Sequence, residues 1–203
     1  MPEDSRSRWS KKILTWRVFK HPSNDIGPER VRSTLQRAFS VWSANADLTF
    51  LEEQETDPTD IRILFESGEH GDGDPFDREG GTLAHAFFPG QGEISGDIHF
   101  DDDENWTLGS YAGINLTQVA VHEIGHSLGL EHTRVRGAIM FPSYEGYRPN
   151  LALAEDDILG IQALYGPPKG APGREPPPLA PEEEWVPGGS MNPWIQLLSC
   201  CFF

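Results

Sequence analysis

Cysteine is almost absent from this chain of 203 residues, which contains only Cys200 and Cys201, side by side near its end. The rest of the sequence therefore has neither a thiol nor a disulfide bond. Long apolar runs are also lacking, because no stretch approaches the about 20 apolar residues that cross a membrane. The polar segment from Pro2 to Ser10 shows no signal peptide.

Positive charge is scarce as well. The chain has 16 basic and 32 acidic residues, so its net charge is −16. This excess of negative charge argues against nucleic acid or an anionic membrane as a partner. The acidic residues gather in runs, which are typical either of solvated loops or of sites for divalent cations.

The chain does contain three histidines and a glutamate at the spacing of a hydrolytic zinc site, between His122 and His132. Because helical residues four apart share one face, His122 and His126 can bind one ion, while Glu123 is turned aside and can transfer a proton. Gly129 can adopt the left-handed conformation that ends the helix and returns His132 as third ligand. The open fourth position would hold a water, whose pKa on zinc is about 7.

A second feature follows the zinc motif. The segment from Ala138 to Pro142 matches a methionine turn, in which Met140 lies beneath the zinc. Two histidines at helical spacing are also compatible with an ordinary structural pair. The extended motif followed by this turn is far more demanding, and it predicts a zinc peptidase.

Apolar periodicity predicts an α+β domain with a twisted mixed sheet. Strands are expected at residues 13–19, 48–52, 61–66, 83–88 and 98–100. Helices are expected from Pro28, from about 115 to 128, and from about 155 to 165. The first helix would bury an apolar stripe formed by Val31, Leu35, Ala38, Phe39 and Trp42.

Over residues 8–166 the chain resembles the catalytic domain of the matrix metalloproteinases, within the metzincin group. The similarity rests on the zinc motif, the methionine turn and segments such as Arg8-Trp9, His70-Gly71-Asp72, Pro75-Phe76-Asp77, Gly80 to Ala86, Gly96 to Asp101 and Asp156-Asp157-Ile158. It implies the metzincin fold, with five strands and three helices. It also implies an extracellular endopeptidase that cleaves matrix or pericellular proteins and is bound by protein inhibitors.

The resemblance also implies a second zinc site, formed by His70, Asp72, His85 and His99. Three nitrogens and one oxygen complete a tetrahedron and leave no position for water, so this zinc would be structural. It would tie the loop around Gly71 to the strands that carry His85 and His99.

Calcium is implied too, with one to three ions. The first would bind the side chains of Asp77, Asp101 and Glu104 and the carbonyls of Arg78, Gly80 and Thr82. The second would bind Asp60, Asp97 and carbonyls near Gly92 and Ser95, and the third Asp25, Asp102 and Glu104. The family normally has glycine at position 78, and the 90–96 loop is one residue longer here. Solvated acidic loops are the alternative to these sites.

Substrate-binding residues follow from the same resemblance. The edge strand around Leu83, Ala84 and Ala86 would pair with the substrate backbone, and Pro142 to Tyr144 would form the opposite wall. Gln118 would shape the pocket for the residue that follows the scissile bond. Leucine is commoner there, so glutamine should change the depth or polarity of that pocket.

The proposed domain is flanked by an N-terminal extension, residues 1–7, and by a disordered tail, residues 167–203, where nine prolines lie between Pro167 and Pro193. Within the domain, Ala154 replaces the serine that usually caps the last helix, at an expected cost of about 1 kcal/mol. Asp156 and Asp157 should partly offset that loss. Two other functions remain open: a non-catalytic metal-stabilised binding module, which would tend to lose Glu123, and an inactive truncated product.

Overall fold

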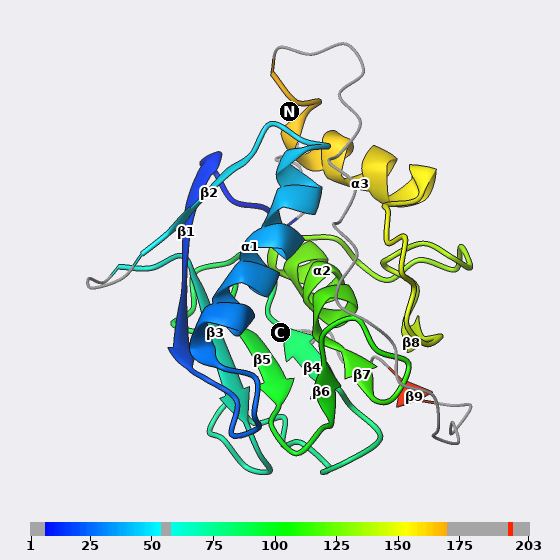
Figure 1. The fold of residues 1–203 in the computed structure, drawn as a ribbon. Helices are drawn as coiled ribbons and strands as arrows, with labels where there is room; N and C mark the ends of the chain where they lie inside the picture. Colours follow the sequence, from blue (N-terminus) through cyan, green and yellow to red (C-terminus); the bar gives the residue numbers. More distant parts are fainter. Residues whose placement is uncertain (1–6, 54–57, 170–194, 197–203) are drawn as a thin grey trace.

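The computed structural model describes residues 7–53, 58–169 and 195–196. Its centre is a five-stranded mixed sheet in the order β2-β1-β3-β5-β4 (Figure 1). The strands are β1 Ile13–Lys20, β2 Thr49–Glu52, β3 Ile61–Glu66, β4 Ala84–Ala86 and β5 Ile98–Asp101. The first four in this order are parallel, and β4 runs antiparallel to β5 at one edge of the sheet. That arrangement leaves one side of β4 without a neighbouring strand in the sheet.

The sheet forms because one of its faces is apolar. In β3, the buried Ile61, Ile63 and Phe65 alternate with residues that are half-buried on the other face, as the two-residue period of a strand requires. Phe65 stacks on Phe100 of β5, with ring centroids 4.9 Å apart. The strands are therefore held in register by the same side chains that build the core.

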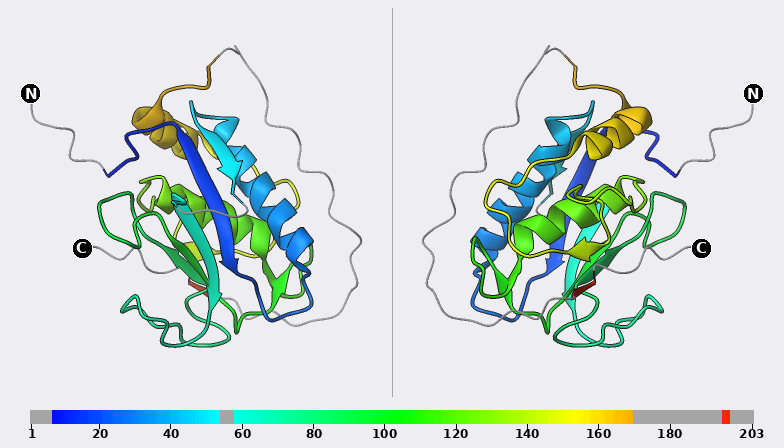
Figure 2. Two further views of the ribbon diagram at one scale, coloured as in Figure 1. Left: turned by 90° about the vertical axis from the view of Figure 1, so that its left-hand side faces the viewer. Right: turned by 90° about the vertical axis from the view of Figure 1, so that its right-hand side faces the viewer.

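Three helices complete the domain: α1 Pro28–Ser43, α2 Leu116–Ser127 and α3 Glu155–Tyr165. Helices α1 and α2 pack together on the same face of the sheet, and α3 lies near one end (Figures 1 and 2). The indole of Trp42 in α1 donates to the carbonyl of Val121 in α2 over 2.9 Å. This hydrogen bond helps to fix the position of α2, the helix that carries the zinc motif, relative to α1.

The expected five-stranded α+β domain is confirmed, and the bounds of β3 and α3 are as predicted. Strand β4 is shorter than predicted, because regular pairing ends before Phe87 and the chain then enters a turn at Pro89 and Gly90. Two small two-stranded sheets had no sequence signal. They join β6 Trp106–Thr107 to β7 Ile114–Asn115, and β8 Ser143–Tyr144 to β9 Ile195–Gln196.

The N-terminal segment of the described chain is bound to the end of α2. The indole of Trp9 donates to the carbonyl of Ser127, and the Trp9 amide donates to the hydroxyl of Tyr165, which in turn donates to the carbonyl of Leu128. These carbonyls belong to the last turn of α2, which has no internal donors for them. Among the residues that the structure describes, no helix is long and apolar enough to span a membrane.

Candidate active site and metal centres

The three histidines of the zinc motif converge. The Nε2 atom of His122 lies 3.0 Å from that of His126 and 3.2 Å from that of His132, and the last two are 3.1 Å apart. Two nitrogens bound to one tetrahedral zinc at 2.0–2.1 Å would lie about 3.3 Å apart. The side chains therefore match the ligand set of a zinc ion with three protein ligands.

Backbone carbonyls orient two of the rings. The Nδ1–H of His122 donates to Ile139 O, and that of His126 donates to Leu130 O, each over 2.6 Å. Each bond leaves the Nε2 lone pair directed toward the cluster. Burial lowers the pKa of His122 to about 3 and that of His126 well below its usual value, so both rings are neutral and able to bind a metal at neutral pH.

Two glycines make this arrangement possible. Gly129 has φ +100° and closes α2 with bonds from its own N–H to His126 O and from Leu130 N–H to Gly125 O, as in a glycine-terminated helix. Gly125 was not singled out from the sequence. A β-carbon there would collide with the sulfur of Met140. The methionine turn can therefore pack directly beneath the helix only because residue 125 has no side chain.

Glu123 lies in α2 beside the first ligand, and only 2% of it is exposed. Burial raises its pKa to about 8. Burial favours the neutral form of this carboxyl group, whereas a cation bound nearby would favour the ionised form. This environment suits a group that receives a proton and then passes it on.

Asp157 is a positioning residue that sequence reasoning assigned to a different task. Its carboxylate accepts hydrogen bonds from the N–H groups of Ile139 at 2.8 Å, Met140 at 3.0 Å and Ala154 at 2.8 Å. The buried side chain thus joins the methionine turn to the start of α3. The bond from the Ala154 N–H to Asp157 is one of the two bonds of a capping box, and the other is missing because Ala154 has no hydroxyl. The predicted helix-dipole effect is therefore only part of the role of Asp157.

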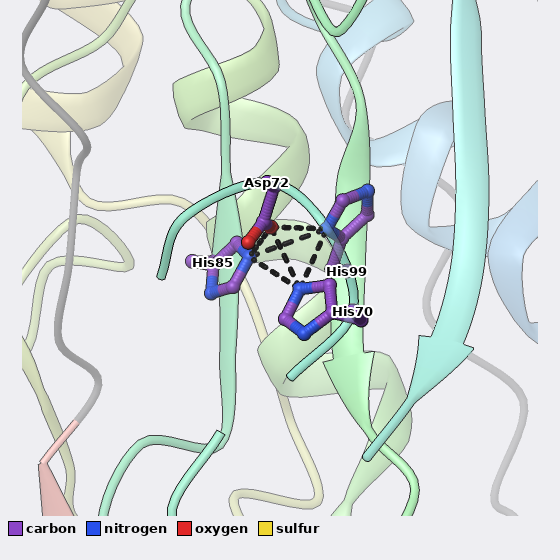
Figure 3. A group of neighbouring side chains, drawn as sticks. All are labelled: His70, Asp72, His85 and His99. Carbon is purple, nitrogen blue, oxygen red and sulfur yellow. Dashed lines mark hydrogen bonds and ion pairs between the residues drawn. The ribbon is translucent and has the colours of Figure 1, made fainter. Parts of the chain in front are cut away.

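The second cluster unites His70, Asp72, His85 and His99 (Figure 3). Asp72 Oδ2 lies 2.7 Å from His70 Nε2 and 2.8 Å from a ring nitrogen of each of the other two histidines. His85 and His99 are register partners on β4 and β5, so their rings project from the same face. His70 and Asp72 come from the preceding loop.

Electrostatics also favour a cation in this cluster. Although burial opposes ionisation, hydrogen bonds from the Asp74 amide and from His85 lower the pKa of Asp72 to about 2. Burial, together with the neighbouring His85, lowers the pKa of His99 to about 4. One carboxylate and three imidazoles at these distances match the four ligands of a tetrahedral zinc.

At the predicted first calcium site, Asp101 and Glu104 are both buried. Asp101 is fully buried, and its Oδ2 has no hydrogen-bond partner. Burial and neighbouring acids raise the pKa of Asp101 to about 6 and that of Glu104 to about 7. Glu104 accepts from the Gly80 amide at 2.7 Å, and Asp77 accepts from the Thr82 amide at 3.1 Å. Both contacts bring the loop of expected carbonyl ligands toward the acids.

Arg78, within the same loop, has φ +74° and is the one residue other than glycine with a positive φ among the described residues. The left-handed conformation is costly for a residue with a β-carbon. Arg78 thus adopts a conformation that is more usual for glycine.

Two of the other predicted calcium ligands, Asp60 and Asp102, have protein partners. Asp60 accepts from the amide and hydroxyl of Thr15 and pairs with Lys11 at 2.6 Å. Asp102 accepts from the Ser23 amide at 2.7 Å, which joins the 23–25 turn to the end of β5. Asp25 is exposed.

The predicted substrate-binding residues lie at the edge strand β4, on α2 and in the segment that follows the methionine turn. Leu83, Ala84 and Ala86 lie on or next to the edge strand β4. Beside His122, a cavity of about 10 Å³ is lined by Gln118, Ala138, Ile139, Phe141, Ser143, Glu145 and Arg148. The side-chain Nε2 of Gln118 donates to Gly146 O at 3.1 Å, and its side-chain Oε1 accepts from the backbone N–H of Arg148 at 3.1 Å. Gln118 therefore bridges α2 to the loop that closes this pocket, and Tyr144 is buried nearby.

A sheet with an antiparallel edge strand, a zinc helix ended by glycine and a methionine turn beneath it together define a zinc peptidase domain of the metzincin type. Comparison with known proteins narrows the class. The family model described as Matrixin, Peptidase_M10, matches residues 8–166. The chain belongs to this matrixin family.

Curated relatives support that membership. The chain is 49% identical over 158 residues to the hatching enzyme of Paracentrotus lividus, covering 78% of this chain and 26% of that protein. It is 46% identical over 183 residues to human (Homo sapiens) matrix metalloproteinase-16, covering 86% of this chain and 29% of that protein. It is 49% identical over 164 residues to macrophage metalloelastase of Rattus norvegicus, covering 80% and 34%. The chain thus spans about a quarter to a third of the length of these relatives.

Proposed function

We propose that this chain is a zinc- and calcium-dependent endopeptidase that hydrolyses internal peptide bonds of extracellular matrix or pericellular proteins. The observation that carries this proposal is the convergence of three neutral imidazole nitrogens beside the buried carboxylate of Glu123. Family membership supports the reaction class, and the relatives' names support the substrate class.

Zinc held by His122, His126 and His132 would supply a Lewis acid that polarises the scissile carbonyl and acidifies water. Glu123 accepts the proton of the attacking water and then delivers it to the leaving amine, so one carboxylate acts first as base and then as acid. No acyl-enzyme is required. Both steps need a carboxyl group that can gain and lose a proton: burial raises the pKa of Glu123 to about 8, and the charge of a bound zinc ion would lower it again.

The substrate backbone would add to the free edge of β4 at Leu83, Ala84 and Ala86 as an antiparallel strand. Pro142 and Tyr144 would form the facing wall. Support for that wall comes from the pairing of Ser143 and Tyr144 with the extended segment β9. Gln118, bonded to the pocket loop, would limit how deeply the side chain after the scissile bond can enter.

The four-ligand cluster would hold a structural zinc that folds the 70–82 loop onto β4 and β5. The first calcium would bind Asp77, Asp101 and Glu104 with carbonyls of Arg78, Gly80 and Thr82, and the unpaired Oδ2 of Asp101 supports this assignment. A third calcium would bind Asp25, Asp102 and Glu104. Extracellular action and recognition by protein inhibitors of the family belong to the same proposal.

The proton transfer is tested with Glu123→Gln, because glutamine keeps the shape of the side chain but cannot accept a proton. We expect unchanged zinc content and a fall in kcat of at least about 100-fold, the usual contribution of a positioned general base. Glu131→Gln, which alters an exposed glutamate next to the zinc ligand His132, is the matched control and should keep wild-type turnover.

The same pair of variants separates the alternatives. A non-catalytic binding module would bind peptides and cleave none, whether residue 123 is glutamate or glutamine. An inactive truncated product would lack activity in the zinc- and calcium-loaded wild-type chain. Near-normal turnover of Glu123→Gln would refute the assigned mechanism.

A further inference from the structure

The two carboxylates expected at the second calcium are both faced by cations of the chain itself. Asp60, just before β3, pairs with Lys11 Nζ at 2.6 Å. The same carboxylate accepts from the amide of Thr15 at 2.7 Å and from its hydroxyl at 3.0 Å. The Lys11 ammonium therefore balances the charge of Asp60, and the hydrogen bonds from Thr15 hold the Asp60 carboxylate against β1.

Asp97, just before β5, has a similar environment but is more deeply buried, with 2% of the residue exposed. Its Oδ2 lies 3.9 Å from Nη1 of Arg62, and its carboxylate also accepts from the Arg62 amide. The guanidinium is fixed over the ring of Phe19, 4.7 Å from the centroid. Arg62 is therefore a held cation beside Asp97 and not a freely moving surface side chain.

The loop that would provide carbonyl ligands is closed on itself. The Gly92 carbonyl accepts from the Ser95 amide at 3.2 Å, and the Ile94 carbonyl accepts from the Asp97 amide at 3.1 Å. The Ser95 hydroxyl accepts from the Gly90 amide at 2.7 Å. The Gly92 and Ile94 carbonyls and the Ser95 hydroxyl thus each have a partner within the loop.

The predicted first calcium site is different. Asp101 Oδ2 is buried without a partner, and Asp77 and Glu104 bring further negative charge toward it. At the first site the buried Asp101 faces other carboxylates, whereas Lys11 lies 2.6 Å from Asp60 and Arg62 Nη1 lies 3.9 Å from Asp97, where burial still raises the pKa of Asp97 to about 6.

We propose that Lys11 and Arg62 replace the second calcium ion, so that the 90–97 loop is held in place without bound calcium. This inference rests on the proposed function for the first calcium site, with which it contrasts. Calcium bound to Asp97 would lie close to the guanidinium of Arg62, and repulsion between the two cations would weaken its binding. Of the one to three expected calcium ions, the second is thereby replaced by two basic side chains.

The test counts the calcium ions that depend on Asp97. Calcium binding to the full zinc-loaded chain is measured by equilibrium dialysis and calorimetry, with and without Asp97→Asn. In the wild-type background, Asp97→Asn should remove no calcium. In an Arg62→Met background, one additional calcium should bind, and Asp97→Asn should remove it.

Arg17→Met is the matched control. Arg17 is the register partner of Arg62 on β1, and its guanidinium lies over the same Phe19 ring at 4.5 Å. This substitution removes an equivalent stacking contact without removing the cation next to Asp97. It should leave calcium stoichiometry unchanged, and zinc content and circular dichroism should confirm that each variant is folded.

Three results would overturn the proposal: loss of one wild-type calcium in Asp97→Asn, the same stoichiometry in wild type and Arg62→Met, or an equal gain in Arg17→Met. Asp101→Asn distinguishes this from failure of the first calcium site. If Asp101→Asn removes no calcium, the proposed first site is wrong, while the Asp97-dependent count still tests the role of Arg62.

Discussion

The two histidine clusters lie in different kinds of structural element. The three-histidine cluster lies on a fully buried helix and the turn after it, within residues 122–132. The four-ligand cluster spans residues 70–99 and depends on a loop in which Phe76 is the one buried residue between 67 and 82. The first site is shaped by the core, whereas the second has little core to shape it.

This contrast indicates different uses of zinc. At the first site, Ile139 and Leu130 carbonyls orient the rings before a metal binds, so zinc supplies chemistry more than folding energy. At the second site, a zinc ion would close a loop that buries few apolar groups, so its binding would contribute directly to folding.

The largest expected effect is on stability, and it tests this contrast directly. His85→Ala should lower the free energy of unfolding by at least about 3 kcal/mol, a fraction of the about 10–16 kcal/mol that structural zinc gives small zinc domains. His132→Ala, in the other cluster, should abolish activity and cost about 1 kcal/mol or less, because His132 is only partly buried. Denaturant unfolding measures both. Equal losses would show that the two sites do not differ in kind.

Asp157→Asn should come next. It weakens three hydrogen bonds to a buried carboxylate, and each such bond contributes about 1.5–3 kcal/mol. We expect the free energy of unfolding to fall by about 2–4 kcal/mol, with a lower kcat because the methionine turn moves. Asp156→Asn, an exposed neighbour, is the control. Unchanged stability would mean that Asp157 does not hold the turn.

Calcium should stabilise the protein in a pH-dependent way. In the calcium-free protein, the pKa values of Asp101 and Glu104, about 6 and about 7, lie above those of the unfolded chain. The folded state then holds extra protons, so its stability falls as pH rises through this range. Calcium requires the ionised carboxylates, so its stabilising effect should be small near about pH 5 and full near about pH 8. Melting temperatures with and without calcium test this, and a constant difference would contradict it.

The smallest expected effect concerns the strained residue of this loop. Arg78→Gly should raise the free energy of unfolding by about 0.5–1 kcal/mol, because glycine adopts φ +74° without steric cost. Greater freedom of glycine in the unfolded chain limits the gain. The melting temperature in saturating calcium measures the change. A decrease would show that the arginine side chain makes a contact that outweighs the strain.

The sequence predicted best where one pattern determines both structure and chemistry. The four-residue spacing of His122 and His126 and the glycine after their helix predicted the geometry of the three histidines. Periodicity alone also predicted the sheet and α3. Contacts between distant segments had no comparable signal, which is why the bonds of Asp157 to the methionine turn and the role of Gly125 were missed.

The predictions for acidic residues show the same limit. Residue type and resemblance identified Asp60 and Asp97 as candidate ligands, but their partners come from other segments. Lys11 reaches Asp60 through the pairing of β1 with β3, and Arg62 reaches Asp97 through the pairing of β3 with β5. Whether a carboxylate is free for calcium depends on such neighbours. The composition of the residue's own loop does not determine it.

The cap on the zinc helix also sets an order of events during synthesis. Trp9 and Tyr165 meet at the end of α2 although 156 positions separate them in the sequence. A growing chain therefore makes the zinc helix well before the residue that completes its cap. Because contacts between distant residues form late in folding, we expect a nascent chain that stops short of Tyr165 to carry His122 and His126 on a helix with a frayed end. Proteolytic competence would then arise last, once the whole domain has left the ribosome.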